Sequence, residues 1–206
     1  MNIIVFAGPN GSGKSTTIDK FVSMNNLENV PFINADNIAN LLFSHIEDYN
    51  TRNLAAAKYA EAKRHELLEN GESFIFETVL STERNINFLK LAKEKGAKIY
   101  GVYVLTRDPS INVERVKLRV KSGGHGVPED KIVSRYHRCL TLLPKFIDVS
   151  DQMMLFDNST DPHLVMVKAN DKIKVISNQV QDKQWFIDNV LISLKKTNNV
   201  SRFGKY

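Results

Sequence analysis

One stretch of the chain has residue types and spacing that suit phosphate binding. Residues 8–15 read GPNGSGKS, which fits the P-loop pattern of a glycine, four further residues, and then glycine, lysine and serine. Glycines let the backbone curl so that successive N–H groups point at phosphate oxygens, and the helix that follows presents its positive end. The expected nucleotide-binding residues are Gly8, Pro9, Asn10, Gly11, Ser12, Gly13, Lys14, Ser15 and Thr16.

The P-loop pattern also predicts the ligand. Lys14 is expected to reach the β- and γ-phosphates of ATP or GTP as a catalytic residue, and the Ser15 hydroxyl to ligate Mg²⁺. The sequence has no Asn-Lys-x-Asp guanine signature, which disfavours a GTPase. It also has no clear Walker B carboxylate. We therefore expect Mg²⁺ to be held by Ser15, phosphates and water, with Asp36 nearby.

Polar residues at the ends of two predicted strands suit a phosphate acceptor. Asn34 and Asp36 follow one apolar segment, and Glu77 and Thr78 end the next. A kinase needs a carboxylate that accepts the proton of the attacking hydroxyl, and Asp36 is the candidate for this catalytic base. Asn34, Glu77 and Thr78 are predicted to bind the substrate. Asp36 also suits the N-cap of the helix that follows, and the two roles are compatible.

A glycine-rich segment between two basic helices predicts a lid. Four arginines flank the sequence KSGGHGVP, namely Arg115, Arg119, Arg135 and Arg138. A lid that carries guanidinium groups would stabilise the transferring phosphate and exclude water. Arg119 and Arg135, nearest the turn on each side, are the predicted catalytic pair, although solvated helix faces would show the same pattern. His125, within the glycines, is read as surface rather than as an acid or base.

Two more residues lie at strand ends on the other side of the predicted sheet. Asn158 follows the fifth strand and is expected to touch the nucleotide base. Asp108 precedes Pro109 after the fourth strand, which indicates a helix N-cap rather than a Mg²⁺ ligand.

Five short apolar segments predict buried strands, at residues 3–7, 30–36, 73–78, 97–106 and 152–159. Segments with helical spacing or helix-forming residues separate them, so strands and helices alternate along the chain. Such alternation predicts an α/β fold with a doubly wound, mostly parallel five-stranded sheet covered by helices on both faces. Ligands bind such a sheet beyond the carboxyl ends of its strands, where the residues above are expected to lie.

The C-terminal part is predicted to belong to the same domain. Residues 164–177 read as a β-hairpin appendage with a turn around Asn170 and Asp171, followed by an amphipathic helix at 182–196. Residues 197–206 read as a loose tail. No repeat or linker divides the chain, so residues 1–206 are expected to form a single domain.

Composition limits which cell compartment and which classes of partner the sequence favours. The chain has 206 residues, a net charge of +5 and one cysteine, Cys139, which fits a reducing compartment without disulfides. The N-terminus lacks signal-peptide features, and no apolar run approaches the roughly 18 residues of a membrane span. We therefore expect a cytoplasmic protein. The positive charge suits either ordinary surface variation or a basic cleft for a nucleotide, and scattered Lys and Arg disfavour nucleic acid.

The ordered segments AGPNGSGKST, NAD, FETVLS, RVKLRVKSGGHGVPEDKIVSRYHR and FDNS resemble the zeta-toxin-like P-loop kinase family, in its compact branch with a GGHGVP lid. The resemblance implies an ATP- or GTP-dependent kinase, and for toxin members the phosphorylation of UDP-N-acetylglucosamine at a sugar hydroxyl. It implies Lys14 as the P-loop lysine, Asp36 as general base, Glu77 and Thr78 as substrate contacts, and arginines on the γ-phosphate. An antitoxin partner is implied for the same reason.

This chain is more compact than those toxins, because it passes quickly from the third strand to the fourth and leaves less room for a UDP-sugar. Two alternatives stay open from the sequence. One is a nucleic-acid or nucleoside kinase, and the other is a non-catalytic nucleotide-binding regulatory module.

Overall fold

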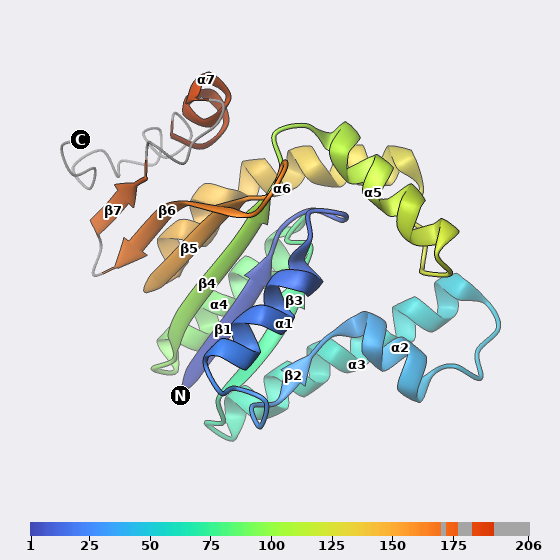
Figure 1. The fold of residues 1–206 in the computed structure, drawn as a ribbon. Coiled ribbons are helices and arrows are strands. Elements are labelled where there is room, and N and C mark those ends of the chain that lie inside the picture. Colours follow the sequence, from blue (N-terminus) through green and yellow to red (C-terminus); the bar gives the residue numbers. More distant parts are fainter. Residues whose placement is uncertain (170–171, 177–182, 192–206) are drawn as a thin grey trace.

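A single twisted sheet with helices on both faces forms the fold (Figure 1). The computed structural model describes residues 1–169, 172–176 and 183–191. The strands are β1 (Asn2–Ala7), β2 (Phe32–Ile33), β3 (Phe74–Thr78), β4 (Lys98–Leu105), β5 (Gln152–Asp157), β6 (His163–Ala169) and β7 (Lys172–Val175). The described helices are α1 (Lys14–Met24), α2 (Ala35–Leu42), α3 (Tyr49–Glu69), α4 (Glu83–Glu94), α5 (Pro109–Lys121), α6 (Glu129–Val149), α7 (Lys183–Phe186) and the π-helix η2 (Ile187–Leu191).

The parallel part of the sheet confirms the predicted fold class. The strand order is β2-β3-β1-β4-β5-β6-β7, and the first five strands in that order pair in parallel. In the register between β1 and β3, Phe6 lies opposite Glu77 and Ala7 opposite Thr78. Because the P-loop begins directly after Ala7, this register places the phosphate-binding turn beside the end of β3.

The sheet is larger than predicted, since the described residues form one sheet of seven strands rather than a five-stranded sheet with a separate hairpin. The 164–177 hairpin is not an appendage, because β6 pairs antiparallel with β5 and β7 pairs antiparallel with β6. This pairing satisfies backbone groups that an unpaired β5 edge would leave exposed. The predicted turn at Asn170 and Asp171, the end of the predicted 182–196 helix and the 197–206 tail lie outside the described residues.

The second predicted strand is shorter than expected. Of residues 30–36, only Phe32 and Ile33 form β2, because Asn34 ends the strand and caps α2. The Asn34 side chain accepts a hydrogen bond from the Asn37 backbone N–H at 3.0 Å, which satisfies one of the first donors of the helix. The chain therefore turns immediately after β2, and α2 begins at the carboxyl ends of the parallel strands, where the P-loop also lies.

Two apolar layers of the core follow the alternation of the strands, and a smaller cluster lies between α5 and α6. Ile3 and Val5 face the larger layer, which is built with residues of α3, α4 and α6. Phe6 faces the other way and packs with Ile18 of α1 and Val102 of β4. Both faces of β1 are therefore buried, which explains its continuous apolar sequence. In the described part of the chain, no helix is both long and apolar enough to cross a membrane.

Candidate active site

Three glycines of the P-loop have conformations and surroundings that exclude a side chain. Gly8, Gly11 and Gly13 have φ angles of 143°, 76° and 93°, a region that L-residues with a Cβ rarely adopt. A Cβ atom on Gly8 would lie 2.1 Å from the Val104 carbonyl oxygen, and one on Gly11 would lie 2.5 Å from the Asn112 carbonyl oxygen. The glycines therefore allow both the curled loop and its close packing on neighbouring elements.

Side chains from three other elements brace the P-loop. Asn112 on α5 donates from Nδ2 to the Asn10 carbonyl oxygen at 2.7 Å, and Asn158 after β5 donates to the Ser12 carbonyl oxygen at 2.7 Å. Arg135 on α6 donates to the Asn10 Oδ1 atom at 3.1 Å. The loop is thus held in shape by contacts that are distant in the sequence.

Asn112 was missed by sequence reasoning. It is fully buried and also bonded to the Thr106 hydroxyl, although it lies on a helix between the apolar residues Ile111 and Val113. A polar residue at a buried helical position was the available signal. Asn158 was expected at the nucleotide base, and in this structure its amide group is engaged with the P-loop itself.

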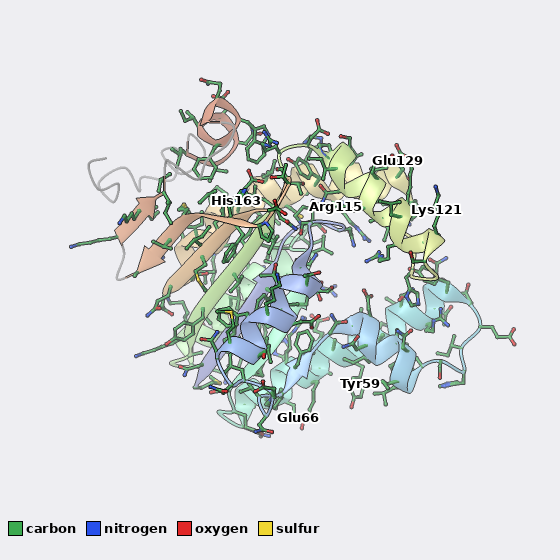
Figure 2. The ribbon with its side chains drawn as sticks, in the orientation of Figure 1. Tyr59, Glu66, Arg115, Lys121, Glu129 and His163 are labelled. Carbon is green, nitrogen blue, oxygen red and sulfur yellow. The ribbon has the colours of Figure 1, made fainter. Side chains whose placement is uncertain are left out.

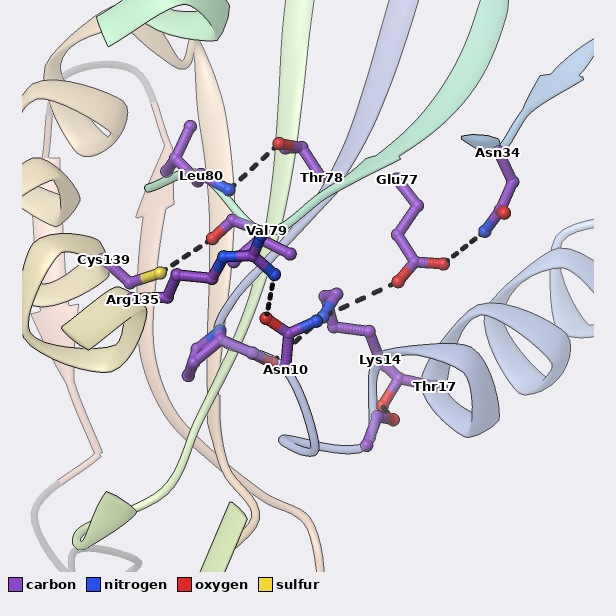
Figure 3. A network of polar contacts seen from close by, with 12 residues as sticks. Asn10, Lys14, Thr17, Asn34, Glu77, Thr78, Val79, Leu80, Arg135 and Cys139 are labelled. Atoms are coloured by element: carbon purple, nitrogen blue, oxygen red, sulfur yellow. Dashed lines mark hydrogen bonds and ion pairs between the residues drawn. The ribbon is translucent and has the colours of Figure 1, made fainter. Parts of the chain in front are cut away.

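The P-loop lysine connects the loop to residues that the sequence predicts to bind the substrate. Lys14 is 5% exposed, and its Nζ atom donates to the Pro9 carbonyl oxygen at 3.0 Å and lies 3.6 Å from Glu77 Oε1. The other oxygen of Glu77 accepts a hydrogen bond from Asn34 Nδ2 at 2.6 Å. Figure 3 shows this line of contacts from Lys14 through Glu77 to Asn34. The first residue of α1 and residues at the ends of β2 and β3 therefore meet in one polar cluster.

Asp36 lies beside this cluster, in the first turn of α2. The N-cap of α2 is Asn34, so Asp36 does not have the capping role that the sequence also allowed. Its side chain is exposed, and it has no hydrogen-bond or ion-pair partner among the residues that the structure describes. A carboxylate with these surroundings is available to accept a proton from a hydroxyl group.

Thr78 shapes the turn that follows Glu77. Its Oγ1 atom accepts hydrogen bonds from the Leu80 backbone N–H at 2.9 Å and from Asn85 Nδ2 at 2.6 Å. Burial raises the pKa of the Cys139 thiol to about 12, so the thiol stays protonated and donates to the Val79 carbonyl oxygen. These contacts fix the exit of β3, which carries Glu77 (Figure 3).

The predicted lid arginines separate into different environments. Arg135 reaches the P-loop, whereas Arg119 donates from Nε to the His125 carbonyl oxygen at 3.1 Å. His125 lies in residues 122–128 between α5 and α6, the predicted lid, which we call the lid loop. Arg115 donates to the Asn158 carbonyl oxygen at 2.7 Å and thereby ties α5 to the end of β5 (Figure 2). Arg138 is exposed on α6. The structure thus brings one member of the predicted catalytic pair to the phosphate-binding loop.

The lid loop is also tied to the opposite side of the molecule. The Tyr49 hydroxyl, at the start of α3, donates to the Gly126 carbonyl oxygen at 3.2 Å. The Tyr49 ring stacks on His125 with centroids 6.5 Å apart. Figure 1 shows the distal end of α5 and the start of α3 meeting beyond the P-loop. His125, read from the sequence as surface, is therefore part of this contact.

The hydroxyl groups available to Mg²⁺ lie at the start of α1. Ser15 and Thr16 are both exposed, directly after Lys14. The described residues contain no group of three or more His, Cys, Asp or Glu that could hold a metal ion. A Mg²⁺ ion that binds one hydroxyl, phosphate oxygens and water needs no such group, so the exposed Ser15 fits the predicted ligand.

The family model of the zeta toxin matches residues 2–181 of the chain. A protein of Haemophilus influenzae that is described as uncharacterized is 35% identical over 135 residues, which cover 65% of this chain and 91% of the relative. A structure of the PezAT chromosomal toxin–antitoxin system of Streptococcus pneumoniae is similar with a TM-score of 0.59 and 16% identity, covering 97% of this chain and 86% of that one. A structure of AvrRxo1-ORF1 with ORF2 and ATP has a TM-score of 0.62 and 16% identity, covering 99% of this chain and 77% of that one. At these identities the structural likeness shows a common fold.

Proposed function

The chain belongs to the zeta toxin family, and we propose that it is a kinase that transfers the γ-phosphate of ATP to a hydroxyl group of a small molecule. The observation that carries this proposal is the contact between Lys14 and Glu77, 3.6 Å apart. A nucleotide-binding lysine that meets an acidic strand end provides adjacent places for a phosphate donor and a hydroxylated acceptor. A nucleotide-binding module without catalysis has no need for the second place.

The proposed transfer uses residues that follow the carboxyl ends of the parallel strands. The P-loop backbone and Lys14 would hold the β- and γ-phosphates, and Ser15 would hold a Mg²⁺ ion, which would supply charge neutralisation on the phosphates. Glu77 and Asn34 hold the acceptor by hydrogen bonds to its hydroxyl groups. The acceptor oxygen forms a bond to the γ-phosphorus while the bond to the β–γ bridging oxygen breaks, and the hydroxyl proton passes to Asp36.

Arginine side chains complete the proposed site. Arg135 already contacts the P-loop residue Asn10, so its remaining guanidinium donors lie close to where phosphates would bind. Arg119 would join it through movement of the lid loop. Positive charge at these positions stabilises the phosphoryl group during transfer. Thr78 supports Glu77 from the turn that follows it.

We infer the identity of the acceptor and the partner from family membership. A UDP-N-acetyl-sugar is the leading acceptor, and the related PezAT structure is named as a toxin–antitoxin system, so an antitoxin protein is the proposed partner. The proposed location is the cytoplasm, where ATP and sugar nucleotides are available. A nucleic acid or a nucleoside is the second candidate acceptor, and the net charge of +5 favours the polyanionic nucleic acid of these two.

The decisive experiment incubates the protein and Mg²⁺ with γ-labelled ATP, in parallel with UDP-N-acetylglucosamine, nucleosides, oligonucleotides and a metabolite extract. We expect the label to appear in one acceptor and Asp36→Asn to reduce this transfer by about 10²- to 10⁴-fold while ATP still binds. Asp19→Asn, at an exposed position of α1, is the matched control and should leave transfer unchanged. Label released only as free phosphate, or full activity of the Asp36 variant, would contradict the proposal.

A further inference from the structure

A pocket lies between helices α3 and α4, apart from the P-loop. Its volume is about 230 Å³. Its polar lining includes Arg64 and His65 from α3 and Arg84 and Asn87 from α4, and Phe88 and Leu91 form an apolar wall. The helices around it pack on the face of the sheet opposite α1. None of these residues belongs to the proposed kinase site.

Arg64 is the unusual residue of this pocket. Its side chain is only 8% exposed, and its guanidinium carbon lies 4.8 Å from the ring centroid of Phe76 and 5.5 Å from that of Phe88. The Nε atom is buried without a hydrogen-bond partner. No described residue accepts a hydrogen bond from any part of this guanidinium group. Buried charges in proteins are normally paired or hydrogen-bonded, and two aromatic faces supply only part of that compensation.

The charges around Arg64 leave one positive charge unbalanced. Burial lowers the pKa of Arg64, although an arginine side chain stays protonated in proteins. Glu61 is the acidic residue of the pocket lining, and its Oε2 atom is 3.1 Å from Arg84 Nη1. Glu61 also acts on Arg64 as a nearby negative charge, but its hydrogen-bonded ion pair is with Arg84, so one carboxylate faces two arginines in this lining.

We propose that this pocket binds a small organic acid, with its carboxylate on the guanidinium group of Arg64. The planar guanidinium offers parallel N–H donors that match the two oxygens of a carboxylate. One negative charge balances the one uncompensated positive charge, which favours a monocarboxylate over a doubly charged phosphate. Phe88 and Leu91 provide an apolar wall for the hydrocarbon part of the acid. His65 and Asn87, which also line the pocket, offer polar contacts.

The test uses benzoate as the probe and benzamide as its neutral isostere, both at constant ionic strength. Calorimetry and thermal unfolding of the full chain should show one benzoate bound per molecule, an increase in melting temperature, and no comparable effect of benzamide. Arg64→Met should weaken benzoate binding by about tenfold or more, because it removes hydrogen bonds to a charged group. Lys58→Met, at an exposed position of the same helix, should bind benzoate as the native chain does.

Two further measurements keep the result decisive. Arg64→Lys retains the charge but not the planar fork, so it should fold and also bind benzoate about tenfold more weakly. ATP titrated into each variant should bind with unchanged affinity, which separates this pocket from the P-loop. Equal binding of benzamide, undiminished benzoate binding by both Arg64 variants, or no benzoate binding at millimolar concentration would overturn the proposal.

Discussion

Lys14 interacts with both a phosphate-binding loop and a carboxylate, and this double role has a consequence for the order of binding. Its Nζ atom contacts the Pro9 carbonyl oxygen and Glu77. A triphosphate attracts the lysine more strongly than one carboxylate does, because it carries more negative charge. We therefore expect ATP to draw Lys14 away from Glu77. Glu77 would then be free to bind the acceptor, so the nucleotide should bind first.

The variant Glu77→Gln tests this competition. It removes the charge that holds Lys14 and keeps an oxygen that can accept from Asn34, so ATP should bind equally or up to about fivefold more tightly. The KM for the phosphate-accepting substrate should rise, because the variant loses the charged carboxylate to which the substrate hydroxyl groups donate hydrogen bonds. Calorimetric titration with ATP and steady-state kinetics measure the two effects. Glu114→Gln, an exposed position of α5, is the control. Weaker ATP binding by the Glu77 variant would show that the ion pair supports the nucleotide site.

Residue identities predicted the P-loop and the residues at the strand ends, but not the contacts between them. The Lys14, Glu77 and Asn34 cluster depends on the register of β1, β3 and β2, which no local pattern encodes. Arg64 gave no signal, because arginine is a common residue in the middle of an exposed helix. Its burial follows from the packing of α3 against Phe76 and Phe88, and is therefore a property of the tertiary structure.

At the scale of elements, helix α5 supports the P-loop and begins at a defined cap. The Asp108 carboxylate accepts a hydrogen bond from the Ser110 backbone N–H at 2.7 Å, as the sequence predicted for this position. The hydrogen bonds to Ser110 lower the pKa of Asp108 from its ordinary value of 3.8. A lowered pKa in the folded state means that the cap stabilises the protein above that value, and that this contribution disappears as the pH falls through the folded-state pKa.

We expect Asp108→Ala to reduce the free energy of unfolding by about 1 kcal/mol near neutral pH. Urea denaturation measures this difference, which should shrink as the pH falls below 3.8, the ordinary pKa of the group. Asp130→Ala serves as the control, because Asp130 lies in the first turn of α6 without capping it, and should cost only a few tenths of a kcal/mol. A pH-independent loss at Asp108 would assign its effect to packing instead.

The sequence predicted some helices and strands correctly and others with wrong bounds or wrong neighbours. The parallel strands were found because both faces are buried and their sequences are continuously apolar. The predicted strand at 30–36 was too long, since the Asn34 cap competes with strand extension. The hairpin was recognised, but not its pairing with β5, because the choice of sheet neighbour depends on which edge is available after the core has formed.

At the scale of the whole molecule, the lid loop connects the end of α5 to the start of α3 (Figure 1). Tyr49 on α3 joins Gly126 and His125 of the loop between α5 and α6. We therefore expect the strength of this contact to set how often the lid loop moves away from α3.

The variant Tyr49→Phe removes the hydrogen bond to Gly126 and retains a ring that can stack on His125. We expect amide hydrogen exchange of residues 122–127 to become about fivefold faster, as one exposed hydrogen bond of roughly 1 kcal/mol is lost. Tyr59→Phe on the same helix is the control, since no hydrogen bond of its hydroxyl occurs among the described residues. Exchange that is equally fast in the native chain and the Tyr49 variant would mean that the contact does not restrain the loop.

The two outermost strands determine how easily two copies of the protein could pair through the edges of their sheets. In the described part of the chain, β2 at one edge has only two residues, and β7 at the other edge exposes Lys172 and Lys174 while Ile173 is buried. A short strand offers few unpaired backbone groups, and lysines on an edge repel the same edge of a second copy. The protein should therefore resist strand-to-strand polymerisation even at high concentration.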